Sequence, residues 1–371
     1  AFLSGGIDSS VVVGLAAAQV PELQTFSVGF PEHPYFDETK YAQLVARKHN
    51  TRHTVVNLTT SDLYHNLFGV LDNLSEPFAD SSALAVYSLS HEVGKSLKVV
   101  LSGDGADELF GGYNKHLAEY RMLNGGISES IVKHSEFLWK LLPKSRNSFL
   151  GNKVRQLQRF AHGANLTPKQ RFWLWATWQT ETDALQLLEA NHRAAIPNRL
   201  YYARKSRLLD CLNNNHHNLN NVLCADWNLV LANDMLPKID LMGMANGLEI
   251  RSPYLDHRLV KYVMSLPVSS KINKHGQKRI LMDTFKDLLP IELLSRKKKG
   301  FEVPLQSFLE TQGKDLVQEL LSESRVKAQG LFDVAEVSKL RDNILSKQGG
   351  DQQAKVWSLL VFQYWWQKYM V

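Results

Sequence analysis

The stretch SGGIDSS (residues 4–10) decides the fold, because two adjacent glycines join an apolar run to a helical pattern. The run AFL (1–3) precedes it and VVVGLAAA (11–18) follows it. Glycine lets the backbone turn sharply and approach a ligand closely, since it carries no side chain. The free N–H groups and positive dipole end of the following helix then face the loop. The sequence therefore predicts an anion cradle, and phosphate is the anion that fits it best.

The side chains of this loop extend the prediction. Ser4, Ser9 and Ser10 supply hydroxyl donors, and the helix is expected to begin near Asp8 or Ser9. An aspartate in a phosphate cradle makes sense if it holds Mg²⁺, which takes one or two carboxylates together with phosphate oxygens. The motifs G-x-x-x-x-G-K-S/T and G-x-G-x-x-G are both absent. The alternative is an ordinary strand–turn–helix with a capping Asp or Ser.

Short apolar runs alternate with helical patterns through the first third of the chain. Strands are expected at 1–3, 25–30, 53–58 and 98–103, where β-branched residues lie between turn signals. Helices are expected at 9–19, 38–49, 61–72 and 82–94. This alternation predicts an α/β fold with a parallel, doubly wound sheet whose ligands bind at the carboxyl ends of the strands.

The remainder of the chain reads as a large helical C-terminal portion. We expect a nucleotide-binding α/β core over 1–120, a helical segment over 121–225 and a mainly helical part over 226–371 that completes the active site. Proline interrupts the last part at Pro237, Pro253, Pro267, Pro290 and Pro304. The aromatic-rich stretch 356–370 has roughly helical spacing and is expected to pack in a core.

Composition narrows the classes of protein. The 371 residues are 44% hydrophobic and 22% charged, which is typical of a globular protein. We find neither a membrane-length apolar run nor a signal segment, and expect a cytoplasmic protein without a membrane partner. The net charge of +6 is too mild to predict a nucleic-acid partner. Two cysteines, Cys211 and Cys224, are too few for a disulfide framework and are expected to be reduced thiols.

A second glycine-broken loop carries a cluster of acids. In VVLSGDGADELFGGY (99–113) an expected strand runs into Asp104, Asp107 and Glu108. Three carboxylates within five residues repel one another unless a cation or a proton lies among them. A surface acidic turn is the structural alternative.

Two further stretches stand out downstream. DMLPKIDLMGMANGLEIRSPYLDHRLVKYVMSLP (234–267) contains a methionine-rich portion that suits a core, and Arg251 and Asp256 on either side of Pro253. These two residues either form a structural ion pair or contact the substrate. SRKKKGFEVPL (295–305) is a basic run, which as composition alone fits a solvated face.

These motifs together resemble a known family. SGGIDSS resembles the pyrophosphate-binding loop of the PP-loop ATP pyrophosphatases, the adenine nucleotide alpha hydrolase-like enzymes. VVLSGDGADELFGGY closely resembles the second signature of the asparagine synthetase (glutamine-hydrolysing) family, and the 234–267 block resembles its EVRxPFLD region. The resemblance runs from residue 1 to about 370, is strongest in four blocks and is thin across 120–225.

The resemblance implies roles for the acids. Asp8 and Asp107 would hold Mg²⁺–pyrophosphate, and Gly103 would lie against the adenosine. Asp104 stands where well-known members carry a glutamate thought to manage a proton during amide formation. Aspartate is one methylene shorter than glutamate but can still act as an acid or base, so Asp104 is a candidate acid/base. The departure from the family pattern leaves the identity of the acceptor acid open.

The resemblance also implies roles for the basic run. Arg296, Lys298 and Phe301 match the family's Arg-x-Lys-x-x-Phe element, in which the lysine approaches the α-phosphate. Lys298 is therefore the expected catalytic lysine that also contacts ATP, with Lys299 as its rival.

Two other stretches match the family more weakly. FSVGF (26–30) matches the strand whose end contacts adenine, which implies contact through the backbone of Val28. SEPFADSSALAVYSLS (75–90) matches the helix start that lines the acyl-substrate pocket, with Glu76, Asp80 and Ser81 as candidates. Plain helix capping explains the last three equally well.

The implied activity is a carbon–nitrogen ligase of the glutamine amidotransferase type. ATP and Mg²⁺ would activate L-aspartate as an acyl-adenylate, and ammonia would convert it to L-asparagine with AMP and pyrophosphate. The family carries an N-terminal glutaminase domain that begins with a cysteine, whereas position 1 here is alanine, so we expect this chain to use free ammonia. The first strand looks cut short, which suggests a fragment of a longer polypeptide, and a homodimer stays open.

Three alternatives remain from the same residues. An amidotransferase of this type could act on another acid or a sugar. β-Lactam synthetases and lasso-peptide cyclases share the motifs and close an internal amide without ammonia. A nucleotide-binding or assembly module without activity would be expected to have lost its carboxylate and lysine positions, and here only Asp104 departs from the family pattern.

Overall fold

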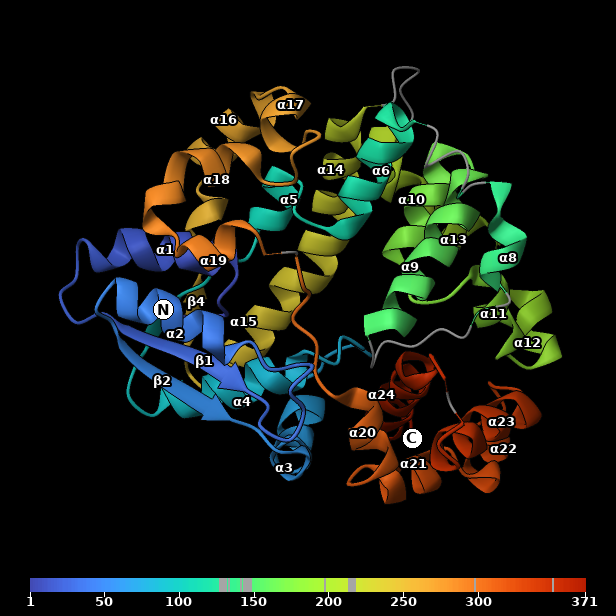
Figure 1. The fold of residues 1–371 in the computed structure, drawn as a ribbon. Helices are drawn as coiled ribbons and strands as arrows, with labels where there is room; N and C mark the ends of the chain where they lie inside the picture. Colours follow the sequence, from blue (N-terminus) through green and yellow to red (C-terminus); the bar gives the residue numbers. More distant parts are fainter. Residues whose placement is uncertain are drawn as a thin grey trace. The chain divides into compact units, whose positions relative to one another are not determined.

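A computed structural model describes residues 1–126, 132, 134–140, 142, 149–196, 198–212, 218–296, 298–348 and 350–371 (Figure 1). These residues form two compact units. Unit 1 combines Ala1–Asn73, Ser82–Gly125 and Asn214–Val303. Unit 2 combines Leu74–Ser81, Gly126–Asn213 and Pro304–Val371. Each unit is described by itself.

Unit 1 contains the strands and the helices that cover them. Its strands are β1 (Gln24–Gly29), β2 (Arg52–Asn57), β3 (Val99–Leu101) and β4 (Glu249–Arg251). Its helices before β4 are α1 (Ile7–Ala17), α2 (Thr39–Lys48), α3 (Thr60–Asp72), α4 (Ala83–Gly94), α5 (Ala106–Phe110), α6 (Asn114–Asn124), α14 (Leu219–Asp226), the π-helix η2 (Trp227–Met235) and α15 (Leu236–Met244). After β4 follow η3 (Pro253–Leu255), α16 (His257–Ser265), α17 (Val268–Lys271), α18 (Arg279–Phe285), η4 (Lys286–Leu288) and α19 (Ile291–Leu294).

The strands form two parallel pairs linked by the first residues of the chain. β1 pairs with β2 from Gln24↔Arg52 onward, and β3 pairs with β4. Phe2 donates its backbone N–H to Leu101 in β3 (2.8 Å), and Leu3 donates to Phe26 in β1 (2.7 Å). Residues 1–3 thus hydrogen-bond to both pairs, and all of these segments end at the same edge because they are parallel.

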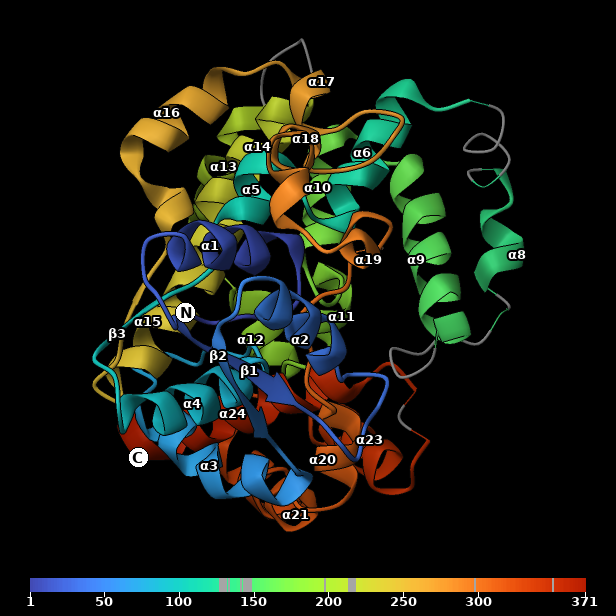
Figure 2. The same ribbon diagram turned by 60° about the vertical axis from the view of Figure 1, so that its left-hand side comes forward.

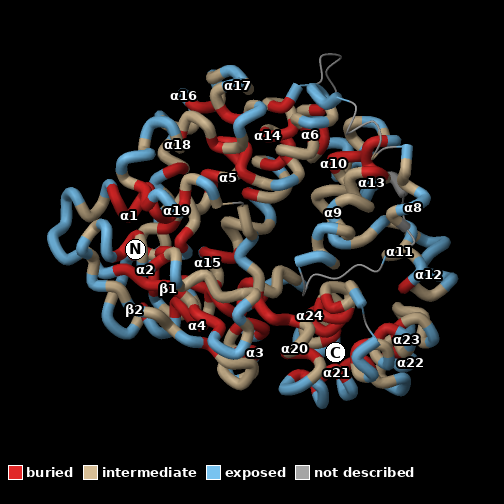
Figure 3. The backbone as a smooth tube through the Cα atoms, in the orientation of Figure 1, coloured by how far each residue is buried: buried red, intermediate tan, exposed pale blue. Residues whose placement is uncertain are grey.

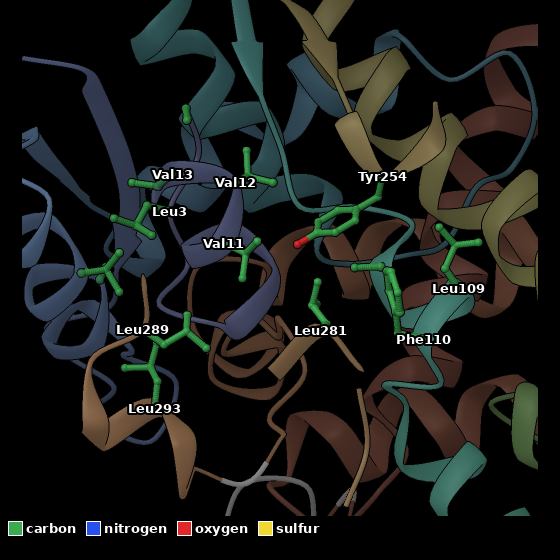
Figure 4. Packing of buried hydrophobic residues seen from close by; sticks show 14 of the residues in the cluster. Leu3, Val11, Val12, Val13, Leu109, Phe110, Tyr254, Leu281, Leu289 and Leu293 are labelled. Atoms are coloured by element: carbon green, nitrogen blue, oxygen red, sulfur yellow. The ribbon is translucent and has the colours of Figure 1, made fainter. Parts of the chain in front are cut away.

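Hydrophobic residues cover both faces of these strands. On one face Leu3 packs with Val12 of α1 and Val45 of α2, and the cluster extends to helices α5, α16 and α18 (Figure 4). On the other face Phe26 packs with Leu89 of α4. Figures 1 and 2 show α1 and α2 on the side of β1 opposite α4. α4 is largely buried, as Figure 3 shows, because it lies between the strands and neighbouring helices.

The α/β class and the parallel strands are confirmed, but the single doubly wound sheet is not. The expected strands 25–30, 53–58 and 98–103 appear within one or two residues as β1, β2 and β3, and the four expected helices appear as α1 to α4. The run 1–3 contributes a single bridge at Phe2 rather than a strand. β4 was missed, because three residues are too few to show a period.

A long helical stretch crosses unit 1 without a break. α14 continues into the π-helix η2 and then into α15, and the residues at both junctions keep helical dihedral angles. Pro237 lies in the first turn of α15, directly after the π-helix η2. Residues 226–303 thus belong to unit 1, and 304–371 to unit 2.

Unit 2 is helical. It contains α8 (Glu136–Lys140), α9 (Phe149–Ala164), α10 (Pro168–Ala176), α11 (Glu181–Gln186), α12 (Ala190–Ala195), α13 (Asn198–Leu208), η1 (Asp210–Leu212), α20 (Leu305–Glu310), α21 (Lys314–Leu320), α22 (Glu323–Gln329), α23 (Val334–Leu345) and α24 (Gln353–Tyr369). The core helix expected at 356–370 is confirmed as α24, where Trp357 is buried and meets Phe308 edge to face at 6.4 Å. Across the described residues, we find no helix with the length and apolarity that crossing a membrane requires.

Candidate active site

The glycine loop (residues 4–10) turns the chain from the strand edge into α1. Gly5 has a φ of +72°, and a Cβ there would lie 2.6 Å from the backbone nitrogen of Ala42 in α2. Glycine is required at this position for both reasons. Gly6 caps α1 without a side-chain hydrogen bond, and α1 begins at Ile7, within two residues of the expected start. The first N–H groups of α1 have no acceptor inside the helix, which is the arrangement of an anion cradle.

The three serines of the loop do not play equal parts. Ser4 is exposed, and its Oγ lies 3.1 Å from the Oγ of Ser9. Ser10 is fully buried, and its hydroxyl donates to the carbonyl of Gly6 at 2.6 Å. Ser4 therefore remains at the mouth of the loop, whereas Ser9 and Ser10 are buried and both donate to the Gly6 carbonyl at the first turn of α1.

The acidic loop (residues 102–108) lies directly beside the glycine loop. A Cβ on Gly103 would lie 2.7 Å from the backbone nitrogen of Ser9, so Gly103 keeps the two loops in contact. The hydroxyl of Tyr254 donates to the carbonyl of Asp8 at 3.1 Å and fixes the start of α1 from the other side. In Figure 4 the Tyr254 ring lies beside Phe110, with its hydroxyl directed toward α1.

Four alternating charges lie where the loops meet. Lys278 Nζ is 2.6 and 2.5 Å from the two carboxylate oxygens of Asp8, and 2.5 Å from Oδ1 of Asp107. The contact with Asp107 Oδ1 is an ion pair whose angles are not those of a hydrogen bond. Lys298 Nζ donates to Oδ2 of Asp107 at 2.6 Å. Two acids from distant parts of the chain therefore share one cation, and a second cation flanks them.

Burial and these contacts shift the pKa values in opposite directions. Burial raises the pKa of Asp8, which has Asp107 as a second negative charge nearby. Burial would also raise the pKa of Asp107, but Lys278 and Lys298 together hold it well below the ordinary value. Burial would lower the pKa of Lys298, and Asp107 and Asp8 raise it instead. Lys298 therefore stays an ammonium ion, ready to face a negatively charged ligand.

The two carboxylates fit a magnesium ion. Asp8 and Asp107 already converge on a single positive charge, the ammonium group of Lys278. Within the described part of the chain we find no group of three or more acids, histidines or cysteines suited to a metal. Two carboxylates suit Mg²⁺, which usually completes its shell with water and substrate phosphates.

Lys278 was missed by sequence reasoning. It is almost fully buried, has a φ of +52° and stands at the start of α18. A Cβ on Gly112 would lie 2.0 Å from Lys278 Cε, so the glycine leaves room for the lysine to reach the acids. A cation at a helix N-terminus opposes the dipole, and the nearby acids compensate this cost; the contact joins distant parts of the chain, so no local sequence signal identifies it.

The structure separates Lys298 from its rival. Lys299 reaches the backbone carbonyl of Tyr35 and lies 4.6 Å above that ring, away from the acids. Of these two neighbours, Lys298 contacts Asp107. Arg296 donates to the carbonyl of Gly5 at 2.6 Å and thereby joins the basic run to the glycine loop.

Glu108 and Tyr113 line the buried side of the acidic loop. The Tyr113 hydroxyl donates to Glu108 at 2.7 Å, and burial beside the charge of Asp107 raises the pKa of Glu108 to about 7. The Lys298 ammonium lies 5.9 Å from the centre of the Tyr113 ring. The sequence analysis included Glu108 among the acids of this loop, but the spacing of the residues did not predict its hydrogen bond with Tyr113.

Asp104 lies at the tip of the acidic loop. Its carbonyl accepts a hydrogen bond from the hydroxyl of Ser252. Among the described residues, its carboxylate has neither a hydrogen-bond partner nor an ion pair, and it is half-buried. The side chain is therefore available to a ligand, as an acid/base candidate must be.

The other predicted site residues of unit 1 are Val28, Arg251 and Asp256, and the Arg251 carbonyl accepts a hydrogen bond from the backbone of Ser102 in the acidic loop at 2.9 Å. Val28 lies near the carboxyl end of β1, in register with Val56. Arg251 and Asp256 do not form the ion pair that the sequence allowed. Arg251 instead pairs with Glu249, and Asp256 pairs with Arg258, each at 2.8 Å. Both pairs lie on an exposed surface, where ion pairs contribute little to stability.

The remaining candidates belong to unit 2 or concern the cysteines. Glu76, Asp80 and Ser81 lie in the Leu74–Ser81 segment of unit 2, whereas the acids and lysines described above belong to unit 1. Their role at an acyl-substrate pocket stays a prediction. Neither described cysteine is a free thiol, so the expectation that Cys211 and Cys224 are reduced was wrong. A count of two cysteines argues against a disulfide framework but does not exclude an oxidised pair.

Comparison with known proteins gives the same family over nearly the whole chain. The family model described as asparagine synthase matches residues 1–367. The glutamine-hydrolyzing asparagine synthetase 1 of Bacillus subtilis (strain 168) is 28% identical over 369 residues, which cover 98% of this chain and 55% of that protein.

Two other relatives agree. A protein of Mycobacterium tuberculosis (strain ATCC 25618 / H37Rv), provisionally named a glutamine-hydrolyzing asparagine synthetase, is 29% identical over 381 residues, covering 98% of this chain and 54% of that protein. The glutamine-hydrolyzing asparagine synthetase of Cricetulus griseus is 46% identical over 67 residues, or 17% of this chain and 12% of that protein. The chain spans about half the length of the first two relatives.

Proposed function

The chain belongs to the asparagine synthase family, and on that premise we propose that it is an ATP-dependent amide-forming synthetase that activates an acid as its acyl-adenylate. The substrates proposed are L-aspartate, ATP and ammonia, and the products L-asparagine, AMP and pyrophosphate. The observation that carries the proposal is the sharing of one cation by Asp8 and Asp107, which come from loops at the ends of neighbouring parallel segments.

The glycine loop suits the leaving pyrophosphate. The first turn of α1 presents free N–H groups, and the hydroxyls of Ser4 and Ser9 lie beside them. Asp8 and Asp107 would hold Mg²⁺, which supplies charge neutralisation on the phosphates. Gly103 and the end of β1 at Val28 are the proposed contacts of the adenosine.

The reaction proposed has two steps. A carboxylate oxygen of the acid forms a bond to the α-phosphorus, and the bond to the bridging oxygen breaks as pyrophosphate leaves. Ammonia then forms a bond to the acyl carbon, AMP leaves with the carboxylate oxygen, and a base takes the extra proton. Asp104 is the proposed base, because its carboxylate is half-buried and has no partner among the described side chains.

Two lysines stabilise the charge that develops on the phosphates. Lys298 stays protonated through its contact with Asp107, and Lys278 lies between both acids. A preorganised cation in a buried site lowers the energy of the transition state without costing reorganisation. The protein thus contributes position and charge rather than a covalent intermediate of its own.

The ammonia source is a separate part of the proposal. The relatives' names include glutamine hydrolysis, which is a property of those longer proteins. We expect the chain to use free ammonia and to release no glutamate from glutamine. In a longer protein of this family, a glutaminase domain would supply the ammonia. Because its proposed co-substrate is ATP, we propose that the enzyme acts in the cytoplasm.

The experiment compares Asp107→Asn with Asp287→Asn, a matched acid-to-amide change at an exposed position of unit 1. AMP formation is measured with ATP, Mg²⁺, ammonia and L-aspartate. We expect Asp107→Asn to lower the rate on the order of 10²- to 10³-fold, as loss of a preorganised catalytic group does. If Asp107→Asn forms AMP at an undiminished rate, the proposed metal site is wrong.

The same assay tests the acceptor. If aspartate gives no AMP while another acid or an amino sugar precursor does, the chain is an amidotransferase with a different acceptor. If AMP forms from a substrate that holds its own amine, and ammonia has no effect, the chain is a cyclase of the β-lactam or lasso type.

A further inference from the structure

The basic segment (residues 295–303) reaches the active site, and its described residues, 295, 296 and 298–303, form neither helix nor strand. Its described cations contact three different places in unit 1. Lys298 contacts Asp107, Lys299 contacts the carbonyl of Tyr35, and Arg296 contacts the carbonyl of Gly5. Side-chain contacts must therefore fix the position of Lys298, because no helix or strand does so.

Arg296 makes the most extensive of these contacts. Besides the Gly5 carbonyl at 2.6 Å, its guanidinium donates to Oε1 of Glu38 and stacks 3.9 Å above the centre of the Tyr41 ring. The planar guanidinium can serve a carbonyl, a carboxylate and an aromatic ring at once, and lysine cannot. The exposed fractions of the Arg296 and Glu38 side chains are 14% and 16%, so this is not a solvated surface pair.

Glu38 is itself held on a fixed turn. The neighbouring Asp37 accepts hydrogen bonds from the backbone of Phe30 at 3.0 Å and from the backbone and hydroxyl of Thr39 at 2.8 and 2.6 Å. Glu38 is the residue before α2, and burial raises the pKa of its carboxyl. A hydrogen-bonded turn thus presents a half-buried carboxylate to Arg296, at the place where α2 contacts the glycine loop at Gly5.

We propose that Glu38 is a positioning residue: by holding Arg296 across the Gly5 carbonyl, it fixes the basic segment so that Lys298 reaches Asp107 and the phosphates. Glu38 does not contact the proposed reacting atoms. It acts through Arg296, and its loss leaves Lys298 protonated but poorly placed. The kinetic test below rests on the proposed function, whereas the protease test depends only on the contact itself.

The protease test uses the ligand-free chain. Trypsin cleavage after Lys298 and Lys299 is followed by mass spectrometry in the unaltered chain, in Glu38→Gln and in Glu92→Gln, whose carboxylate pairs with Lys95 on the exposed surface of α4. We expect Glu38→Gln to raise the cleavage rate by about 10-fold, since local opening controls such cleavage, and Glu92→Gln to leave it unchanged. Equal rates in all three proteins would overturn the proposal.

The kinetic test measures AMP formation in Glu38→Gln, Arg296→Gln and the double variant. We expect kcat to fall by about 10- to 10²-fold in Glu38→Gln, with the KM for the acceptor acid within about twofold, because a small displacement of a catalytic cation costs that much. The double variant should be no slower than Arg296→Gln. If the two losses multiply instead, Glu38 does not act through Arg296 and the proposal fails.

Folding is controlled in both tests. Thermal melting of each variant is recorded, and Glu38→Asp replaces Glu38→Gln if the latter does not fold. The shorter acid keeps the charge but reaches less far, so faster cleavage and a lower kcat are again expected. If the unaltered chain forms no AMP with any acid, the proposed function fails while the trypsin result still decides the role of Glu38.

Discussion

Lys298 and Lys299 are neighbours in sequence, yet their ammonium groups reach different partners. We expect Lys298→Ala to lower the rate of AMP formation on the order of 10²- to 10³-fold, because it removes a cation that contacts Asp107. Lys299→Ala should cost less than about 10-fold, since it removes a contact with the Tyr35 carbonyl outside the acid cluster. Single-turnover rates of both variants check this, and a larger loss in Lys299→Ala would reverse the assignment.

Lys271 offers a test of the folded state that is independent of activity. It is fully buried, its Nζ donates to Asn220 at 3.0 Å, and burial lowers its pKa from 10.5 to about 8. Between these pH values the unfolded chain binds more protons than the folded chain, so the free energy of unfolding rises with pH. Lys271→Met removes this dependence.

From pH 7 to pH 10, the free energy of unfolding of the unaltered chain should increase by about 2 kcal/mol relative to that of Lys271→Met. Urea unfolding of both proteins across this range checks the difference. Parallel pH curves would show that Lys271 is protonated to the same extent in both states.

At the residue scale, sequence reasoning found the acids more readily than their partners. Asp8 and Asp107 follow glycine-broken turns. The electrostatic cost of carboxylates in such turns predicted a cation at each loop, and the family resemblance implied that the two acids share it. Lys278 lies in HGQKR (275–279), where neither periodicity nor a glycine pair distinguishes it. Its importance depends on a contact across some 270 positions of the chain, which a linear pattern does not encode.

Among the elements, the turn before α1 determines the site most directly. Gly5→Ala would place a side chain at a φ of +72° and 2.6 Å from the backbone of α2. We expect the free energy of unfolding to fall by about 2 kcal/mol or more, from the left-handed strain and the forced shift of α2.

Gly6→Ala is the matched control for stability. Gly6 has a φ of −81°, and its nearest neighbour to a new Cβ is the Ser4 hydroxyl at 3.4 Å. Its free energy of unfolding should change by less than about 0.5 kcal/mol. Chemical denaturation of both variants checks the contrast, and equal destabilisation would mean that backbone strain at Gly5 is not the cause.

The elements of the first third of the chain were predictable, because their apolar periods are long enough to show. β1, β2 and β3 appear where short β-branched runs lie between turns, and α24 appears from its aromatic spacing. β4 and the bridge at Phe2 were not resolved in sequence, since each gains its strand geometry from hydrogen bonds to β3 and β1. The π-helix η2 likewise has no sequence signal that separates it from the helices on either side.

At the scale of the whole molecule, composition and motifs predicted an α/β chain with a large helical portion. The two units intersperse along the chain: 226–303 belong with the strands, and 304–371 with the helices of unit 2. Such a division depends on which helices pack together, and this is set by contacts between distant parts of the chain. The fragments of unit 1 nevertheless supply every residue of the acid and lysine cluster.

The central claim is that the acid is activated as an acyl-adenylate, and oxygen transfer tests it most directly. The chain is incubated with ATP, Mg²⁺, ammonia and L-aspartate labelled with ¹⁸O in its side-chain carboxylate, and the nucleotide products are analysed by mass spectrometry. The account predicts unlabelled pyrophosphate and AMP that carries a single ¹⁸O atom, because the attacking carboxylate oxygen leaves with AMP. Unlabelled AMP, or ADP with labelled phosphate, would contradict it.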